Sequence, residues 1–66
     1  MQVHVNGAAH DVPDGTSVSD LLATLGLGGK PCAVEVNTAL IPKADHASCT
    51  LHGGDTIELV TLVGGG

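Results

Sequence analysis

The most informative absences in this sequence are aromatic side chains and basic residues. The 66-residue chain contains no Phe, Tyr or Trp, and only two basic residues, Lys30 and Lys43, against seven acidic ones. Its formal net charge of -5 excludes nucleic-acid binding through phosphate contacts, which needs clustered basic side chains. The same charge argues against adsorption to an anionic membrane. It suits docking onto a basic protein partner, although it also serves solubility alone.

The sequence also lacks long apolar runs and the cysteine spacing of metal sites. No stretch is long enough to span a bilayer, and no export signal is visible. Cys32 and Cys49 have no CxxC spacing and could be paired or free; we expect partly buried free thiols in a reducing cytoplasm. The four histidines follow no metal-binding pattern, so we expect no metal and no bound cofactor. Neither cysteine has a neighbouring base, which predicts that the chain is not an enzyme.

The composition is that of one globular domain, because 42% of the residues are hydrophobic and 14% are charged. The chain opens with Val3 and Val5 alternating with polar residues, which is the period of a half-buried strand. Asn6-Gly7 is typical of a tight hairpin turn and leads into a second strand over 8–12. The sequence therefore predicts an N-terminal hairpin.

One helix follows, with an apolar stripe at helical spacing made of Val18, Leu21, Leu22 and Leu25. Ser17 and Asp20 stand close to a capping box at its start, and Gly26 suits the left-handed residue that ends a helix. We expect the helix to run from about Val18 to Leu25 and to pack on a sheet, because it is too short to be stable alone.

Three further strands and one unassigned segment complete the domain. The pattern predicts a strand over 33–36, a turn at Asn37-Thr38, a short edge strand over 40–41 ended by Pro42, an unassigned segment over 43–51, and a longest strand over 56–63. One helix across a mixed sheet of four to five strands is the α+β architecture of the β-grasp, or ubiquitin-like, fold. We expect this domain to cover residues 1–63 and a flexible glycine tail to cover 64–66.

The last strand is apolar on both faces toward its end. Its alternation predicts one face with Ile57, Leu59, Thr61 and Val63 and an opposite face with Glu58, Val60 and Leu62. A buried central strand would explain this pattern, and so would an exposed apolar patch that binds a partner. Both readings are open at this point, and Val60, Leu62 and Val63 are the candidate partner-binding residues.

The chain ends in Gly64-Gly65-Gly66, three residues without side chains that could extend roughly 10 Å through a narrow channel. An ionised terminal carboxylate resists nucleophiles, but adenylation with ATP would make it a substrate for a sulfur nucleophile and yield a thiocarboxylate. We therefore expect the carboxylate of Gly66 to be the group that is modified, with the catalysis supplied by partner proteins. An ordinary frayed terminus is the alternative.

Taken together, these motifs resemble those of the ThiS family, the sulfur carriers of thiamine biosynthesis. The resemblance rests on 3–7, on 16–22, on 34–37 followed by 40–43, on 54–59 and on the terminal 63–66. It departs from the family at His46, where members often have an aromatic residue.

The resemblance implies that Gly66 carries the sulfur, that Gly65 forms the other half of the diglycine, and that Gly64 and the strand leading to it guide the tail. It also implies a set of partners. A ThiF-type enzyme would adenylate Gly66 with ATP, a donor such as a cysteine desulfurase persulfide would supply the sulfur, and thiazole synthase (ThiG) would receive it. The alternatives are the small subunit of molybdopterin synthase, another sulfur carrier, a ubiquitin-like modifier, and a plain interaction module.

Overall fold

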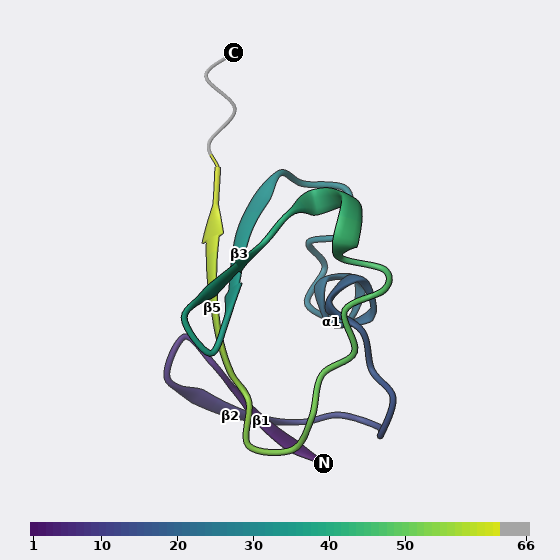
Figure 1. Ribbon diagram of the computed structural model, residues 1–66, viewed down its shortest axis with the longest axis vertical. Coiled ribbons are helices and arrows are strands. Elements are labelled where there is room, and N and C mark those ends of the chain that lie inside the picture. The colour runs from purple at the N-terminus through teal and green to yellow at the C-terminus, as the bar shows by residue number, and fades with distance from the viewer. Residues whose placement is uncertain (63–66) are drawn as a thin grey trace.

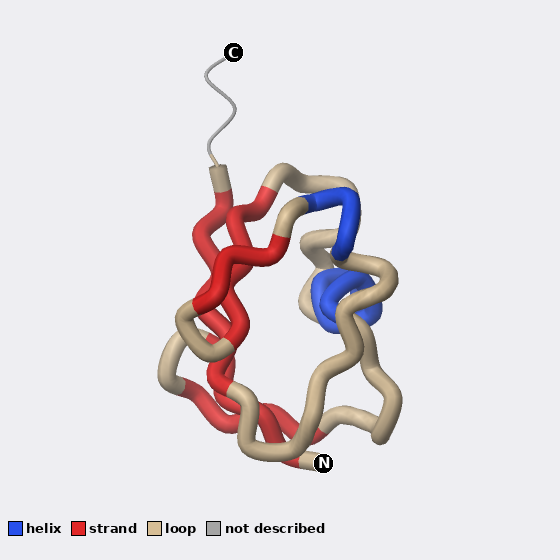
Figure 2. The backbone as a smooth tube through the Cα atoms, in the orientation of Figure 1, coloured by secondary structure: helices blue, strands red, loops and turns tan. Residues whose placement is uncertain are grey.

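A single five-stranded sheet with one α-helix across it forms the protein (Figure 1). The computed structural model describes residues 1–62. The elements in chain order are β1 (Gln2–Val5), β2 (Ala8–Asp11), α1 (Val18–Thr24), β3 (Cys32–Val36), β4 (Ala39–Ile41), the 3₁₀ helix η1 (Lys43–Asp45) and β5 (Thr56–Thr61). The strands lie on one side of the molecule, and α1, η1 and the connection to β5 lie on the other (Figure 2). The predicted boundary between residues 63 and 64 falls outside the described residues.

The N-terminal hairpin forms as predicted, around a turn of two residues with positive φ. Asn6 has φ 50° and Gly7 has φ 84°, so both adopt the left-handed conformation that a two-residue hairpin turn requires. Val5 pairs with Ala8 at the end of the antiparallel ladder. The second strand ends at Asp11, one residue earlier than expected, although Val12 still exchanges two backbone hydrogen bonds with Met1, at 2.7 Å and 2.8 Å, and is buried in the core.

Helix α1 begins and ends where the capping residues predict. The Ser17 side chain accepts a hydrogen bond from the Asp20 N–H at 3.0 Å, and the Asp20 carboxylate accepts one from the Ser17 N–H at 3.1 Å. This reciprocal pair satisfies two backbone donors that the first turn leaves free. Leu25 is the C-terminal cap rather than a helical residue, and Gly26 follows with φ 76°. The prediction was therefore one residue too long.

Strand β5 occupies the centre of the sheet, whose order is β2-β1-β5-β3-β4. It runs parallel to β1 and antiparallel to β3, while the β1–β2 and β3–β4 pairs are antiparallel. A hairpin, a helical crossover and a last strand inserted beside the first strand make the β-grasp fold. The prediction of a mixed sheet with one helix is confirmed, and Pro42 does follow an edge strand.

The segment left unassigned by sequence closes the core on the helix side. It contains η1 and then Leu51, which is 1% exposed, and His46, which is 7% exposed. A ring nitrogen of His46 lies 3.1 Å from the carbonyl oxygen of Ile41, and the His46 carbonyl accepts a hydrogen bond from the Ser19 N–H at 3.0 Å. His46 thus links β4 to α1. The buried hydrophobic residues are Val3, Val5, Val12, Val18, Leu21, Leu22, Val34, Leu51, Ile57 and Leu59.

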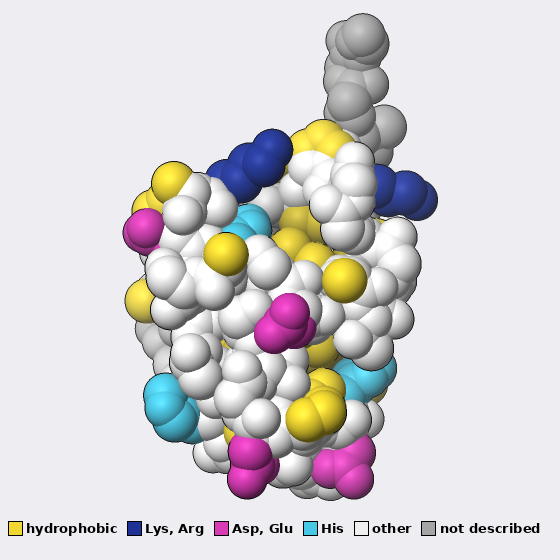
Figure 3. Space-filling model, turned by 90° about the vertical axis from the view of Figure 1, so that its right-hand side faces the viewer, with side chains coloured by type: hydrophobic (Ala, Val, Ile, Leu, Met, Phe, Trp, Pro, Cys, Tyr) yellow, Lys and Arg dark blue, Asp and Glu magenta, His cyan; other side chains and the backbone are white. Residues whose placement is uncertain are grey.

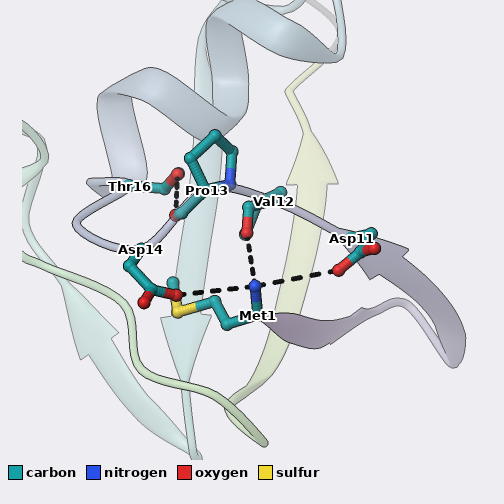
Figure 4. A network of polar contacts seen from close by, with 6 residues as sticks. All are labelled: Met1, Asp11, Val12, Pro13, Asp14 and Thr16. Atoms are coloured by element: carbon teal, nitrogen blue, oxygen red, sulfur yellow. Dashed lines mark hydrogen bonds and ion pairs between the residues drawn. The ribbon is translucent and has the colours of Figure 1, made fainter.

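The amino group of Met1 joins the start of β1 to the segment before α1 (Figure 4). It donates a hydrogen bond to the Val12 carbonyl at 2.7 Å and lies 3.7 Å and 3.5 Å from the carboxylates of Asp11 and Asp14. Both carboxylates are almost fully exposed, so water screens these ion pairs and they add little stability. The hydrogen bond to Val12 is therefore the main contact of this group.

Asn6 extends the parallel pairing of β1 and β5 with its side chain. Its amide donates to the Leu59 carbonyl at 3.1 Å and accepts from the Leu59 N–H at 2.8 Å. The side-chain amide thus replaces the backbone of a neighbouring strand where β1 has already turned into the hairpin. Residues far apart in sequence are tied together at the hairpin turn.

Replacing Asn6 with glycine is expected to lower the free energy of unfolding by about 1–3 kcal/mol, because two partly buried backbone groups of Leu59 lose their partner. Glycine accepts the positive φ without strain, so the change isolates the amide. Thermal unfolding measures the effect, at about 4–8 °C for each kcal/mol in a domain of this size. Thr38→Gly is the control, because Thr38 also has positive φ (72°) but its side chain makes no hydrogen bond within residues 1–62. Equal loss of stability in both variants would contradict a specific role for the Asn6 amide.

Candidate functional site

The end of β5 and the uncovered face of the sheet form the candidate site. Along β5 the side chains alternate, so that Ile57 (0% exposed) and Leu59 (9%) face α1. Glu58 and Val60 face the opposite side, which we call the outer face. No helix among the described residues covers the outer face (Figures 1 and 2).

Two large apolar side chains near the end of β5 are exposed on the outer face. Val60 is 59% exposed and Leu62 is 52% exposed, and Val60 lies opposite Ala33 of β3. We call Val60 and Leu62 the β5 apolar patch. Strand β5 is the central strand, yet within residues 1–62 its outer face is exposed near Val60 and Leu62. Partner binding by these residues stays a prediction. Thr61, expected on the inner face, pairs with Cys32 at the end of the sheet and is exposed.

Carboxylates and a further leucine lie beside the β5 apolar patch. Glu58 pairs with Glu35 of β3, and Glu35 in turn pairs with Leu40 of β4, so the three share the outer face. Leu40 is 66% exposed and was missed in the sequence as an outward-facing residue. The charged residue Glu35, which pairs with Leu40 and points away from the core, was the signal that could have indicated the outward direction of Leu40. The outer face therefore combines apolar and negatively charged side chains.

The last described backbone contact fixes the direction in which β5 leaves the sheet. The Leu62 N–H donates to the Pro31 carbonyl at 2.9 Å, one residue before β3 begins. Val63, the third predicted partner-binding residue, and the glycines Gly64, Gly65 and Gly66 lie outside the described residues. In the sequence, the β5 apolar patch thus lies immediately before residues 63–66, for which the sequence predicts the sulfur chemistry.

The thiols and histidines do not form a second centre of this kind. Cys32 and Cys49 are half-buried free thiols, as predicted. Within residues 1–62, no group of three or more His, Cys, Asp or Glu side chains is arranged to hold a metal ion. In the same part of the chain, no helix has the length and apolar content needed to cross a membrane.

Comparison with known proteins defines the family. Residues 3–66 match the ThiS family, and the match includes the β5 apolar patch and all three terminal glycines. The chain belongs to the ThiS family. In structure it is similar to the thiamine biosynthesis protein ThiS of Geobacter metallireducens, with a TM-score of 0.84 and 28% sequence identity over the full length of both chains.

Two curated relatives of this ThiS-family chain are much longer than it is. It is 36% identical over all 66 residues to a thiazole synthase of Magnetococcus marinus and 33% identical to a thiazole synthase of Paramagnetospirillum magneticum. The chain spans 20% of the length of each of these relatives. In both relatives, the part that is similar to this chain therefore belongs to a longer protein that is named a thiazole synthase.

Proposed function

We propose that this protein is a sulfur carrier that supplies the thiazole moiety in thiamine biosynthesis. The match to the ThiS family over residues 3–66 is the observation that carries the proposal. The whole-chain structural similarity to a thiamine biosynthesis protein supports it. The thiazole synthase relatives favour thiazole synthase as the sulfur acceptor over molybdopterin synthase.

The chemistry proposed for Gly66 has two steps. A ThiF-type enzyme joins the Gly66 carboxylate to the AMP portion of ATP and releases pyrophosphate. A sulfur nucleophile, such as the persulfide of a cysteine desulfurase, then attacks the acyl carbon, and AMP leaves with the bonding electron pair. A thiol then attacks the donor sulfur of the resulting acyl disulfide, which forms a disulfide with the donor cysteine and leaves a thiocarboxylate on Gly66. The chain supplies the substrate group and its partners supply the catalysis, so it acts as a carrier rather than an enzyme.

The intact mass of the protein tests this proposal. The purified chain is incubated with a ThiF-type enzyme, ATP and a sulfur donor, with omission of ATP as the control. We expect a mass increase equal to the replacement of one oxygen by one sulfur, located at Gly66 by fragmentation. An unchanged mass with an enzyme that loads another carrier would contradict the proposal.

The β5 apolar patch is proposed to bind the activating enzyme. Val60→Asp or Leu62→Asp is expected to weaken that complex at least about tenfold, because a charge replaces an apolar contact at the centre of an interface. The melting temperature should change little, because both side chains are already more than half exposed.

Ala9→Asp provides the matched control for this prediction, since Ala9 is also an exposed strand residue but lies on the distant edge strand β2. Calorimetric titration measures affinity and thermal unfolding measures stability. Unchanged affinity together with a large fall in melting temperature would show that Val60 and Leu62 act in folding instead.

We also propose that the protein works in the cytoplasm. The two half-buried free thiols are consistent with a reducing compartment.

A further inference from the structure

A recess on the helix side of the molecule brings together both lysines of the chain. Its volume is about 160 Å³, and its lining includes Ser19, Leu22, Lys30, Cys32, Lys43 and His46. In Figure 3 two dark-blue side chains flank apolar side chains at this end of the molecule. They are Lys30 and Lys43, because the sequence has only these two basic residues.

Lys30 and Lys43 are distant in the sequence, and the fold brings them to the same recess. Lys30 precedes β3, where its N–H donates to the Leu27 carbonyl at 3.0 Å, and Lys43 is the first residue of η1. Across residues 1–62 neither ammonium group lies within 4.0 Å of a carboxylate, and no acidic residue lines the recess. Two side chains whose positive charges have no carboxylate partner among residues 1–62 thus line one small recess, in a protein whose net charge is -5.

We propose that this recess binds a small dianionic oxyanion of the phosphate class. Two ammonium groups match a charge of -2, and lysine is a common phosphate ligand that acts as a point charge. Ser19 is half-buried and lines the same recess, and its hydroxyl is a further potential donor. The His46 ring already contacts the Ile41 carbonyl, so we assign it to the wall of the recess and not to the groups that bind the anion.

The size of the recess restricts what it can hold. Its volume equals that of about five water molecules, and it is below the roughly 300–1,000 Å³ of pockets that enclose drug-sized ligands. It therefore fits a phosphate group and leaves any larger attached molecule in solvent. This site is separate from the outer face and does not depend on the proposed sulfur chemistry.

Titration of the isotope-labelled chain, followed by amide NMR shifts, tests the binding. Inorganic phosphate and AMP are the two probes, which separate a free anion from a phosphate group on a nucleotide, and acetate is the monoanion control. We expect saturable shifts at Ser19, Lys30, Cys32 and Lys43 with a dissociation constant on the order of 1 mM at low salt, and no saturable shift with acetate. Saturation by either phosphate probe supports the site. Shifts spread evenly over the protein, or none at these residues, would overturn it.

Lysine variants identify the groups responsible. Lys30→Gln and Lys43→Gln are each expected to weaken phosphate binding about three- to tenfold, whereas Lys30→Arg and Lys43→Arg keep the charge and the binding. Both positions are exposed, so the fold should remain intact in all four variants. Equal affinity in the glutamine and arginine variants would refute the role of the charges.

The two cysteines provide an internal probe of the local potential. Cys32 lines the recess and Cys49 does not, although both are half-buried thiols. We compare alkylation by anionic iodoacetate with alkylation by neutral iodoacetamide, using peptide mass spectrometry to follow each thiol. The iodoacetate-to-iodoacetamide rate ratio should be several-fold higher at Cys32 than at Cys49 and should fall when phosphate is added. Equal ratios at the two thiols, unaffected by phosphate, would contradict a cationic site.

Discussion

Deletion of Gly66 is expected to reduce sulfur loading at least about 100-fold while leaving thermal unfolding unchanged. The deletion withdraws the terminal carboxylate by about 3.3–3.6 Å. Misplacement of a reacting group by only about 1 Å can cost a factor of 100 in rate. Stability should be retained because the buried residues of the described chain end at Leu59.

Two further variants make this test specific. Ala47→Gly changes an exposed residue far from the last strand along the chain and should load normally, which controls for handling of the variant. Addition of one glycine after Gly66 restores a glycine terminus but displaces it outward, and should also load poorly. Mass spectrometry reports loading in every case. A chain ending at Gly65 that still accepts sulfur would show that the position of the carboxylate is unimportant.

Replacement of Leu21 with alanine is expected to lower the free energy of unfolding by about 2–5 kcal/mol. Leu21 is 0% exposed and lies on the face of α1 that contacts the sheet. A domain of this size has only about 3–10 kcal/mol of stability in total. Urea titration should therefore show a midpoint far below that of the parent chain, or a chain already unfolded without denaturant.

Leu40→Ala is the matched control for the same chemical change. Leu40 is 66% exposed on the edge strand β4, so its removal leaves no cavity and should cost less than about 0.5 kcal/mol. Similar losses at Leu21 and Leu40 would mean that the core is not organised around α1 as the structure describes.

Local patterns were sufficient to predict most of the fold. The hairpin could be read from Asn6-Gly7 because positive φ at both positions admits few residue types, and helix α1 could be read from the stripe around Leu21 with Ser17 at its start. Each of these signals lies within a short, continuous stretch of the sequence. The errors in the element boundaries concerned the ends of elements: the strand predicted over 8–12 ends at Asp11, and the strand predicted over 56–63 ends at Thr61, so that Leu62 lies after it.

The features that sequence reasoning missed depend on contacts between distant segments. The double hydrogen bond of Asn6 with Leu59 joins opposite ends of the chain, and a turn asparagine gives no indication of such a partner. The burial of His46 follows from how the connection before β5 folds over α1, a segment without regular periodicity. The outward direction of Leu40 follows from its register with Glu35. The β5 apolar patch could be anticipated, because a single helix can cover only one face of the sheet.

The parallel arrangement of β1 and β5 has a mechanical consequence. The free end of β1 and the end of β5 that leads out of the domain lie at opposite ends of the molecule (Figure 1). A force between them loads the bonds from His4 to Asp55 and from Asn6 to Ile57 in shear, together with the Asn6 amide pair on Leu59. Bonds loaded in shear must break at the same time, whereas bonds that are peeled break one after another. A partner that pulls on the chain beyond Leu62 therefore loads all the hydrogen bonds between β1 and β5 together. The domain can be held by its last strand without unfolding from that end.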